Sequence, residues 1–596
     1  MLKFTDEQLI AMSKKGLIHL LSGATDTDHP MGTVTIEDLP ELFLRFLIRQ
    51  HNAKVDHVMS HIPSHRHQFR YKIEKLQIPT YGDFQRILDD NDWKKRVDPE
   101  LRKARDFSSY RRWVLRQEPL STWFRPLMAK PFSFTIPAKF RARHTFLLGS
   151  SGSGKSEAIK VCIINSKQHL NVDAPPTTKR DMSIVLIDPH GDLAEDFARE
   201  RMYHGDFRER VNQGKTDYDL IYIDPLLKAN ENIFPVLNPF DVASKRYSRF
   251  QLEKIAQQLV SAITSILGND TGLSLNMSTL LHPCVVVLLS FQGKTMLDLM
   301  RFMNDDPELI ALGQQSTNTA HRMFFRERFK NTAFKRTKEA IATKIQSLTN
   351  NEVFTKVVCG SRSTIDLESA VNSGASIIVN CAKGKLGNEV SSSFGKLIVA
   401  MLLAIAFNRA EQRGPRIPIS LFVDECQNFI SPAIQTALTE ARKYRLDVTL
   451  AQQVIGQGMD PELTKIILGN TAVKAIGNAG NFSLNTMAKE MGAPPEVFQN
   501  LSVGTFVTKC GDHPPVRMRM DSSHVGGKTC MSTSEWAELI SAISGKYYRK
   551  ENVSGEHHHE TKDQQLTEEI TAGDVTPTTA EDTTEKPLFD VDHFEL

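Results

Sequence analysis

The sequence has no hydrophobic run long enough to cross a lipid bilayer. Its longest strongly apolar stretch, LIVAMLLAIAF, covers the eleven residues 397–407, whereas a membrane-spanning helix needs about 20. The first sixteen residues lack the apolar centre of a secretory signal. We therefore expect no membrane span in this sequence, and we interpret 397–407 as part of a buried core helix.

Cysteine is scarce, and its spacing is informative. The seven cysteines are scattered, with no C-x-x-C pair and no spacing typical of zinc ligands. This pattern argues against a disulfide framework or a structural zinc site, and it favours reduced thiols in a cytoplasmic protein.

Negative charge is concentrated at the end of the chain. Residues 556–596 carry twelve Asp or Glu and two Lys, a net charge of −10 within a total of +3. The rest of the chain is therefore basic, which indicates a polyanionic partner such as nucleic acid. The segment 551–596 predicts a disordered acidic tail. Its last residues, KPLFDVDHFEL, predict either a docking segment for a partner or an inert solubilising end.

Residues 1–130 predict a helical, basic N-terminal domain. Between 66 and 130 the sequence has sixteen Lys or Arg and nine Asp or Glu, interleaved with aromatic residues. This composition is compatible with a nucleic-acid surface. It is equally compatible with a solvated helical domain whose charges pair with one another.

Residues 131–550 follow a different pattern. Short runs rich in Ile and Val, among them HTFLLG, MSIVLID, ISLFVDE and DVTLAQQ, alternate with amphipathic stretches. Apolar strands that alternate with helices are typical of an α/β domain with a parallel sheet flanked by helices. From about 244 to 373 the apolar spacing is almost entirely helical, which predicts an all-helical insertion. This insertion contains the basic and aromatic stretch RMFFRERFKNTAFKRTKEAIATK.

A glycine-rich loop lies between the first apolar strand of this domain and the helix after it. The sequence GSSGSGKS satisfies the pattern G-x-x-x-x-G-K-[ST]. Inward-pointing backbone N–H groups and a helix N-terminus bind phosphate, and the Lys and Ser suit the β- and γ-phosphates and Mg²⁺. We therefore predict a RecA-like P-loop NTPase that uses ATP and Mg²⁺. The predicted ATP-binding residues are Gly149, Ser150, Ser151, Gly152, Ser153, Gly154, Lys155 and Ser156.

Two apolar strands end in an aspartate that could serve the magnesium ion held by Ser156. One ends at Asp188 and the other at Asp424, and only Asp424 is followed by a second acid, Glu425. Adjacent acids permit a division of roles: Asp424 holds Mg²⁺ through water, and Glu425 polarises the attacking water as a general base. We assign the catalytic pair to Asp424 and Glu425, with Asp188 as the alternative.

The strand that ends at Asp188 continues into the turn DPHGD. Ligands of open α/β sheets bind at the carboxyl ends of the strands. His190 and Asp192 could therefore face the phosphates or a DNA channel. A purely structural turn would explain the same residues.

Four motifs in this order resemble the HerA/FtsK superfamily: LLGSSGSGKSE, VLIDPHGDLAE, ISLFVDECQNF and TEARKYRLDVTLAQQ. Within it the likeness is closest to the type IV secretion coupling proteins, the ATPases of conjugative DNA transfer, and covers roughly residues 132–545. The resemblance implies a homo-hexameric ring that couples ATP hydrolysis to sequence-neutral movement of DNA through its channel. The resemblance also implies a secretion-channel or relaxase partner, for which the acidic tail is one candidate binding segment.

Two further site residues are assigned through this resemblance. Arg442 matches the arginine finger that enters the neighbouring subunit's site, and Gln453 matches a polar sensor of the γ-phosphate. Gln452 is the alternative to Gln453, because successive residues of a strand face opposite sides. Arg442 and Lys443 could instead complement a helix dipole.

The chain departs from the coupling proteins in one respect. Those proteins usually begin with transmembrane helices, and residues 1–130 contain no such run. We therefore expect a cytoplasmic motor that either is recruited to a membrane by a partner or works away from it, as in DNA processing, plasmid or phage DNA movement, or defence. Two alternatives stay open: an ATPase of the same fold that drives protein secretion, and a nucleotide-switched scaffold with negligible turnover.

Overall fold

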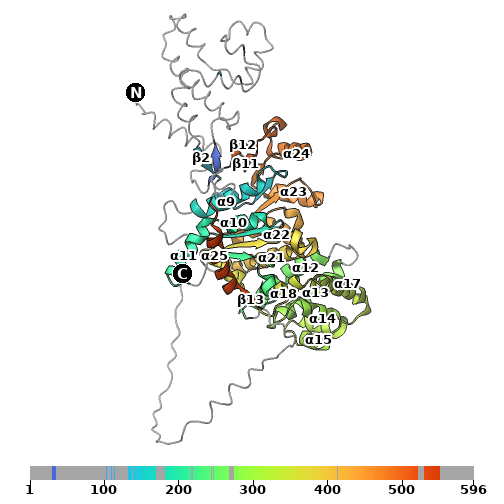
Figure 1. Ribbon diagram of the computed structural model, residues 1–596. Helices are drawn as coiled ribbons and strands as arrows, with labels where there is room; N and C mark the ends of the chain where they lie inside the picture. The colour runs from blue at the N-terminus through green and yellow to red at the C-terminus, as the bar shows by residue number, and fades with distance from the viewer. Residues whose placement is uncertain are drawn as a thin grey trace, which may run out of the picture. The chain divides into compact units, whose positions relative to one another are not determined.

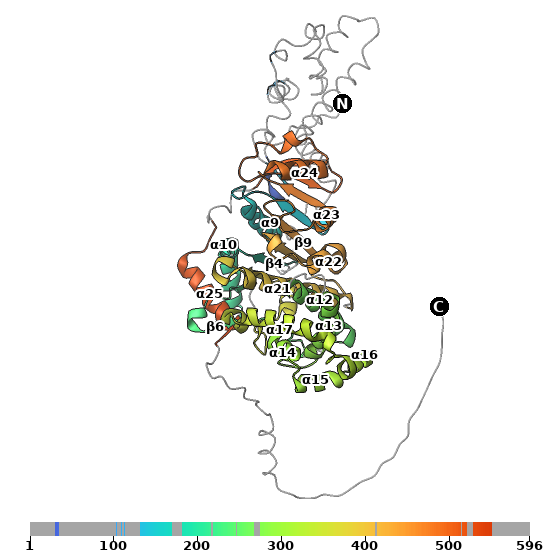
Figure 2. The same ribbon diagram turned by 90° about the vertical axis from the view of Figure 1, so that its right-hand side faces the viewer.

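The computed structural model describes most of residues 132–550 (Figures 1 and 2). Gaps within this range lie at 137, 170–181, 216–218, 243, 246, 268–273, 412–413, 514 and 521–528, and the description also includes 30–34 and the single positions 103, 109 and 113. The rest of the predicted helical domain 1–130 and the predicted disordered tail 551–596 lie outside the described residues. Both therefore stay predictions.

An eleven-stranded sheet forms the centre of the described region. Its strands, in spatial order, are β2 (Phe132–Thr135), β1 (Pro30–Val34), β12 (Val516–Arg519), β11 (Thr505–Cys510), β10 (Val473–Ile476), β3 (Thr145–Leu148), β9 (Leu446–Gln452), β8 (Ile419–Val423), β4 (Ser183–Asp188), β7 (Ser376–Asn380) and β5 (Leu220–Ile223). All neighbours from β10 to β5 are parallel. The strands from β11 to β2 add an antiparallel extension. The predicted RecA-like parallel sheet is confirmed.

Helices cover both faces of this sheet, which explains why its central strands are apolar throughout. Every residue of β4 and β8 is buried. Helices α9 (Lys155–His169) and α10 (Asp192–Ala198) lie on one side of the sheet, and α22 (Pro432–Glu440) and α23 (Pro461–Asn470) lie on the other (Figure 2). In a right-handed crossover, the direction in which the chain crosses from strand to strand decides which face of the sheet its helix covers. The chain crosses the sheet in one direction through the first pair of helices and in the opposite direction through the second pair, so the two pairs lie on opposite faces.

Helix α21 (Asn388–Asn408) contains the longest apolar run of the sequence. By length and composition it could cross a membrane, but 72% of its most apolar window is buried inside the protein. Leu402 and Leu403 are fully buried. The prediction of a core helix around 397–407 is therefore confirmed.

The predicted all-helical insertion is also confirmed. It lies between β6 (Ile233–Pro235) and β7, and forms the green part of Figure 1. Its elements are α12 (Arg249–Leu267), α13 (Ser274–Leu289), α14 (Met296–Met303), α15 (Pro307–Gln314), α16 (Thr319–Met323), η5 (Phe324–Arg328), η6 (Thr332–Phe334), α17 (Lys335–Thr349), α18 (Glu352–Val358) and α19 (Leu367–Asn372). Helix α12 packs against α21 and so joins the insertion to the domain built on the sheet.

The basic and aromatic stretch of the insertion is divided between inside and outside. Phe324, Phe325, Phe329 and Phe334 are buried and form ring contacts with one another and with Phe302. The aromatic residues therefore build the core of the insertion. Most of the charged side chains of this stretch lie at its surface.

At its C-terminal end the described chain returns to the sheet. After β10 come α24 (Asn481–Met491) and the antiparallel strands β11 and β12. Helix α25 (Thr533–Tyr547) then packs against α11 (Arg201–Asn212), and β13 (Tyr548–Lys550) pairs with β6.

Candidate nucleotide-binding site

Strand order brings the predicted site residues together at the carboxyl edge of the parallel sheet. The phosphate loop follows β3, the acidic pair follows β8, and β9 lies between these two strands. The residues that end β9 therefore emerge between the loop and the acids. These three strand ends border a cavity of about 480 Å³, to which the turn after β4 also contributes.

The phosphate loop is fixed by backbone contacts with its neighbours. The N–H of Gly149 donates to the Gln452 carbonyl at 3.1 Å, and the N–H of Ser150 donates to the Asn478 carbonyl at 2.8 Å. On the other side of the loop, the Gly504 N–H donates to the Ser153 carbonyl at 3.0 Å. Asn478 and Gly504 were not predicted, because they contribute only backbone atoms and belong to no motif.

Gly154 shows why this loop needs glycine. Its φ is +89°, a left-handed conformation that disfavours residues with a side chain. A Cβ atom at this position would also lie 3.0 Å from the backbone nitrogen of Gly504. A side chain here would therefore displace either the loop or the turn that supports it.

The acidic pair lies against the lysine and serine that end the loop. Lys155 forms an ion pair with Glu425 and lies 3.4 Å from Asp424 Oδ1. The Ser156 hydroxyl donates to Asp424 Oδ2 at 3.3 Å. Lys155, Asp424 and Glu425 are each at most 6% exposed. These charges are thus buried and paired with one another, and the structure brings the predicted Lys155, Ser156, Asp424 and Glu425 together.

Glu425 is held by several donors at once. Besides Lys155, Gln427 donates to its Oε2 at 2.6 Å and Gln453 donates to its Oε1 at 2.8 Å. Burial alone would raise the pKa of Glu425, but the hydrogen bonds and the charge of Lys155 outweigh it, so the pKa lies below its ordinary value. Glu425 is therefore a carboxylate at neutral pH. Sequence reasoning missed Gln427, which no motif marks.

The two glutamines at the end of β9 differ in position. Gln453 reaches Glu425, whereas the Gln452 side chain donates to the Gln457 carbonyl at 2.8 Å. The alternation of side chains along the strand separates them. Of the two candidates for the polar sensor, Gln453 is the one beside the acidic pair.

Asp188 has a structural role. Its side chain accepts the backbone N–H groups of His190, Gly191 and Ala194, each at 2.9 Å. Burial raises its pKa, although these N–H donors oppose that effect. Asp188 thus supports the start of α10, while His190 and Asp192 line the cavity beside it.

The donor set at this edge fits Mg²⁺ bound together with a triphosphate. Mg²⁺ uses one or two protein oxygen ligands and takes the others from phosphate and water. The contact between Ser156 and Asp424 places one hydroxyl and one carboxylate side by side. No cluster of three or more His, Cys, Asp or Glu suited to a metal ion occurs among the described residues, so the phosphate groups would have to complete the ligand set.

Arg442 lies far from these residues, at the opposite edge of the sheet. It belongs to η9 (Ala441–Tyr444), a 3-10 turn where the sequence predicts a continuous helix, and its side chain is exposed. Strand β9 begins shortly after it and runs seven residues to the nucleotide edge, a span of roughly 23 Å. The guanidinium therefore cannot reach the phosphate loop of its own chain.

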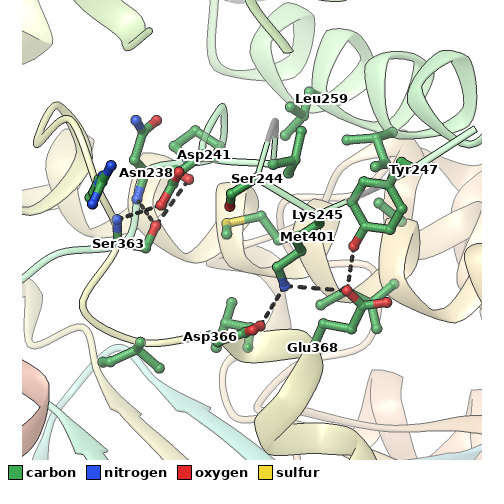
Figure 3. Close-up of a pocket in the computed structure, with 18 of the residues that line it drawn as sticks. Asn238, Asp241, Ser244, Lys245, Tyr247, Leu259, Ser363, Asp366, Glu368 and Met401 are labelled. Carbon is green, nitrogen blue, oxygen red and sulfur yellow. Dashed lines mark hydrogen bonds and ion pairs between the residues drawn. The ribbon is translucent and has the colours of Figure 1, made fainter. Parts of the chain in front are cut away.

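A second cavity, of about 370 Å³, lies where the helical insertion joins the core (Figure 3). Lys245 pairs with Asp366 and Glu368 there, and the Tyr247 hydroxyl donates to Glu368. Lys245, Asp366 and Glu368 are thus engaged with one another, and no glycine-rich loop is among the described residues that line this cavity. The phosphate loop makes the first cavity the better nucleotide site.

Residues 131–380 match the family model described as "Helicase HerA, central domain". No curated protein matches the chain.

Solved structures with a similar chain include the bacterial conjugative coupling protein TrwBdeltaN70 in an unbound form, with 14% identity, a TM-score of 0.46, and coverage of 65% of this chain and 86% of that one. Another is TrwB in complex with ADP and Mg²⁺, with 14% identity, a TM-score of 0.45, and coverage of 65% and 87%. A third is VirB4 of Thermoanaerobacter pseudethanolicus, with 12% identity, a TM-score of 0.36, and coverage of 63% and 89%.

Proposed function

We propose that this chain, whose ATPase region is of the HerA/FtsK type of P-loop ATPase, is a motor that hydrolyses ATP to move DNA. The observation that carries the proposal is the buried group formed by Lys155, Asp424 and Glu425 beside the phosphate loop. A loop that only binds phosphate does not require a second carboxylate held next to the first. A hydrolase requires it to polarise water.

The described residues divide the work of hydrolysis. Backbone N–H groups of the loop and Lys155 bind the phosphates. Ser156 and Asp424 would hold Mg²⁺, which would supply positive charge to the phosphate oxygens. Glu425 accepts a proton from the attacking water, and Gln453 positions that water or the γ-phosphate.

The ion pair between Lys155 and Glu425 couples binding to chemistry. The γ-phosphate carries more negative charge than a carboxylate, so it competes with Glu425 for the Lys155 ammonium group. When Lys155 turns to the phosphate, Glu425 loses its strongest partner and its pKa rises towards the ordinary value. It then becomes a better base at the moment when substrate is present.

A cation from a second copy completes the site. We assign this role to Arg442, which is exposed and lies at the edge of the sheet away from its own nucleotide. In a ring, that edge of one protomer can face the phosphate loop of the next. An arginine inserted there stabilises charge on the transferred phosphoryl group. The proposed assembly is therefore a homo-hexameric ring with shared sites.

The helical insertion supplies a surface for DNA. Five cations of its basic stretch are exposed, and no ion pair holds them among the described residues: Arg326, Arg328, Lys330, Lys335 and Arg336. Their aromatic neighbours fill the core, so these side chains are left to solvent. Such cations favour the phosphate backbone and carry no sequence information, as a sequence-neutral motor requires.

The place of action and the partners follow from the same proposal. The motor works in the cytoplasm on conjugative or related mobile-element DNA, and a secretion-channel or relaxase partner recruits it to a membrane through the acidic tail. Residues 1–130, 131–550 and 551–596 are then the N-terminal domain, the motor with its insertion at about 244–373, and the recruiting tail.

Stimulation of the ATPase by DNA tests the proposal. The rate is measured with no DNA, with single-stranded DNA and with double-stranded DNA, each at two salt concentrations. We expect at least one form of DNA to raise the rate, and the gain to shrink at the higher salt concentration. An ATPase rate that is the same with and without DNA would favour the protein-secretion ATPase. ATP binding without turnover would favour the nucleotide-switched scaffold.

A further inference from the structure

A nucleotide on the phosphate loop must place its base against some surface of the protein. Single exposed apolar side chains are common on protein surfaces, so they are informative only where they lie together beside a binding site. Seven large hydrophobic residues of the described region are exposed: Val211, Phe250, Phe291, Met323, Val454, Phe482 and Val503. Three of these, Val454, Phe482 and Val503, lie in segments that join strands at the phosphate-loop edge of the sheet.

Val503 lies directly beside the loop. It precedes β11, which is antiparallel to β10, so the start of β11 lies where β10 and β3 end. The neighbouring Gly504 donates its N–H to the Ser153 carbonyl, and a Cβ atom on Gly154 would lie 3.7 Å from Val503 Cγ1. Although it touches the loop, Val503 is 70% exposed.

Phe482 lies earlier in the same connection between β10 and β11, and its side chain is also 70% exposed. It is the second residue of α24. This helix follows β10 through a loop whose Asn478 carbonyl accepts both the N–H and the hydroxyl of Ser150, at 2.8 and 2.9 Å. The next residue, Ser483, accepts the backbone N–H of Ile455 at 3.2 Å. The start of α24 is therefore tied to the phosphate loop and to the segment after β9.

The direction of a bound nucleotide follows from the acidic pair. Asp424 and Glu425 lie on the β8 side of β3 and mark the γ-phosphate end, whereas Val503 and Phe482 lie on the β10 side. A triphosphate that begins at the acidic pair extends its ribose and base towards β10 and β11. We propose that Val503 and Phe482 form the apolar surface that binds the base and ribose of the nucleotide. The inference rests on the nucleotide binding proposed above.

This surface has a consequence for the choice of substrate. A valine and a phenylalanine contact the face of a base and not its hydrogen-bonding edge. Face contacts favour any purine nucleotide over a bare triphosphate. They do not separate ATP from GTP, whose differences lie at the edge.

Binding of three ligands to the full-length chain tests the inference. ATP, GTP and inorganic tripolyphosphate, each with Mg²⁺, are titrated into the wild type, Val503→Ser, Phe482→Ser and the control Phe250→Ser, whose replaced side chain is 71% exposed on the insertion. We expect Val503→Ser to weaken ATP and GTP alike by about five- to tenfold, with a smaller loss for Phe482→Ser. Tripolyphosphate binding stays unchanged in both variants, and Phe250→Ser changes nothing.

Two results would overturn the inference. One is wild-type protein that binds ATP no more tightly than tripolyphosphate. The other is a Val503→Ser variant whose affinities for ATP and tripolyphosphate keep the wild-type ratio. Failure of the phosphate-loop assignment itself would look different, because Lys155→Ala would then leave tripolyphosphate binding unchanged.

Discussion

The charged residues proposed for catalysis are buried at the carboxyl edge of the parallel sheet, where its strands end, and exposed at the amino edge, where its strands begin. At the carboxyl edge, Lys155 and Glu425 are 6% and 3% exposed and form an ion pair. At the amino edge, Arg442 is exposed, and no ion pair holds its guanidinium within the described part of the chain. A group that acts in its own site can be buried and positioned in advance. A group that acts in a neighbour's site must stay at the surface until the neighbour arrives.

The largest expected effect comes from removing the buried cation. Lys155→Ala removes the charge that we propose binds the β- and γ-phosphates, and it leaves Asp424 and Glu425 buried without their partner. We expect ATP binding to weaken at least about 100-fold and turnover to fall to background. Titration of ATP and a steady-state ATPase assay measure the two effects. Nearly normal ATP affinity would contradict the role of Lys155.

Removing the exposed cation should affect turnover alone. Arg442→Ala is expected to lower the ATPase rate about 10³-fold, within the range known for arginine fingers, and to leave ATP binding unchanged. The matched control is Lys443→Ala, the adjacent exposed cation of the same turn. Equal losses in the two variants would favour a helix-dipole role over a finger.

The carboxylate side of the buried pair is expected to act in the chemical step. Glu425→Gln keeps the size of the side chain but removes the base, so we expect ATP binding to persist while turnover falls about 10²- to 10³-fold. Asp188→Asn is a useful comparison, because Asp188 accepts three backbone N–H groups. We expect Asp188→Asn to lower the thermal unfolding temperature of the protein. A normal ATPase rate in Glu425→Gln would refute the assignment of Glu425 as the base.

A smaller effect is expected on the helical insertion. A triple change of Arg326, Arg328 and Lys335 to Gln should weaken DNA binding and reduce the slope of log affinity against log salt by up to about 3. The control changes Lys254 and Lys344, lysines that already pair with Glu411 and Glu389. DNA titrations at several salt concentrations measure the slope. An unchanged slope in the triple variant would remove this surface from the proposal.

The smallest effect concerns the amino edge. His144 is buried there and its Nδ1 accepts the Val448 N–H; burial lowers its pKa from 6.5 to about 4. As pH falls, His144 is therefore protonated in the unfolded chain before it is protonated in the folded chain. The stability contributed by neutral His144 is lost as pH falls from 6.5 towards 4. We expect the difference in unfolding free energy between wild type and His144→Asn to shrink by about 3 kcal/mol over this range. A difference that stays constant with pH would contradict this.

The sequence predicted the parts of the site that local patterns encode. The loop 149–156 and the acids 424 and 425 could be placed because each follows an apolar strand. Contacts that depend on strand order could not be placed. The support from Asn478 and Gly504 requires the neighbours of β3 to be known. The hydrogen bond from Gln427 to Glu425 is local, but it depends on the turn after β8, which no motif marks. Gln453 was assigned through the family resemblance, and the structure places it, and not Gln452, beside Glu425.

For the fold, too, local sequence patterns predicted the elements but not the contacts between distant segments. Uniformly apolar strands predicted a parallel sheet, and apolar spacing predicted the helical insertion. The spacing of apolar residues did not show that the phenylalanines of the basic stretch face inward. An apolar helical face can pack into the core of the protein or bind a partner at its surface, and its spacing is the same in both cases. The pairing of β1 with β2 and β12 was also missed, because it joins strands that lie far apart in the sequence.

Mixed assemblies of two inactive variants test the shared site most directly. Lys155→Ala subunits keep Arg442, and Arg442→Ala subunits keep Lys155, so some boundaries in a mixed ring contain both residues. We expect the mixture to hydrolyse ATP at a rate that neither variant reaches alone. Assemblies shown by mass measurement to contain both variants, yet no more active than the separate proteins, would contradict the shared site.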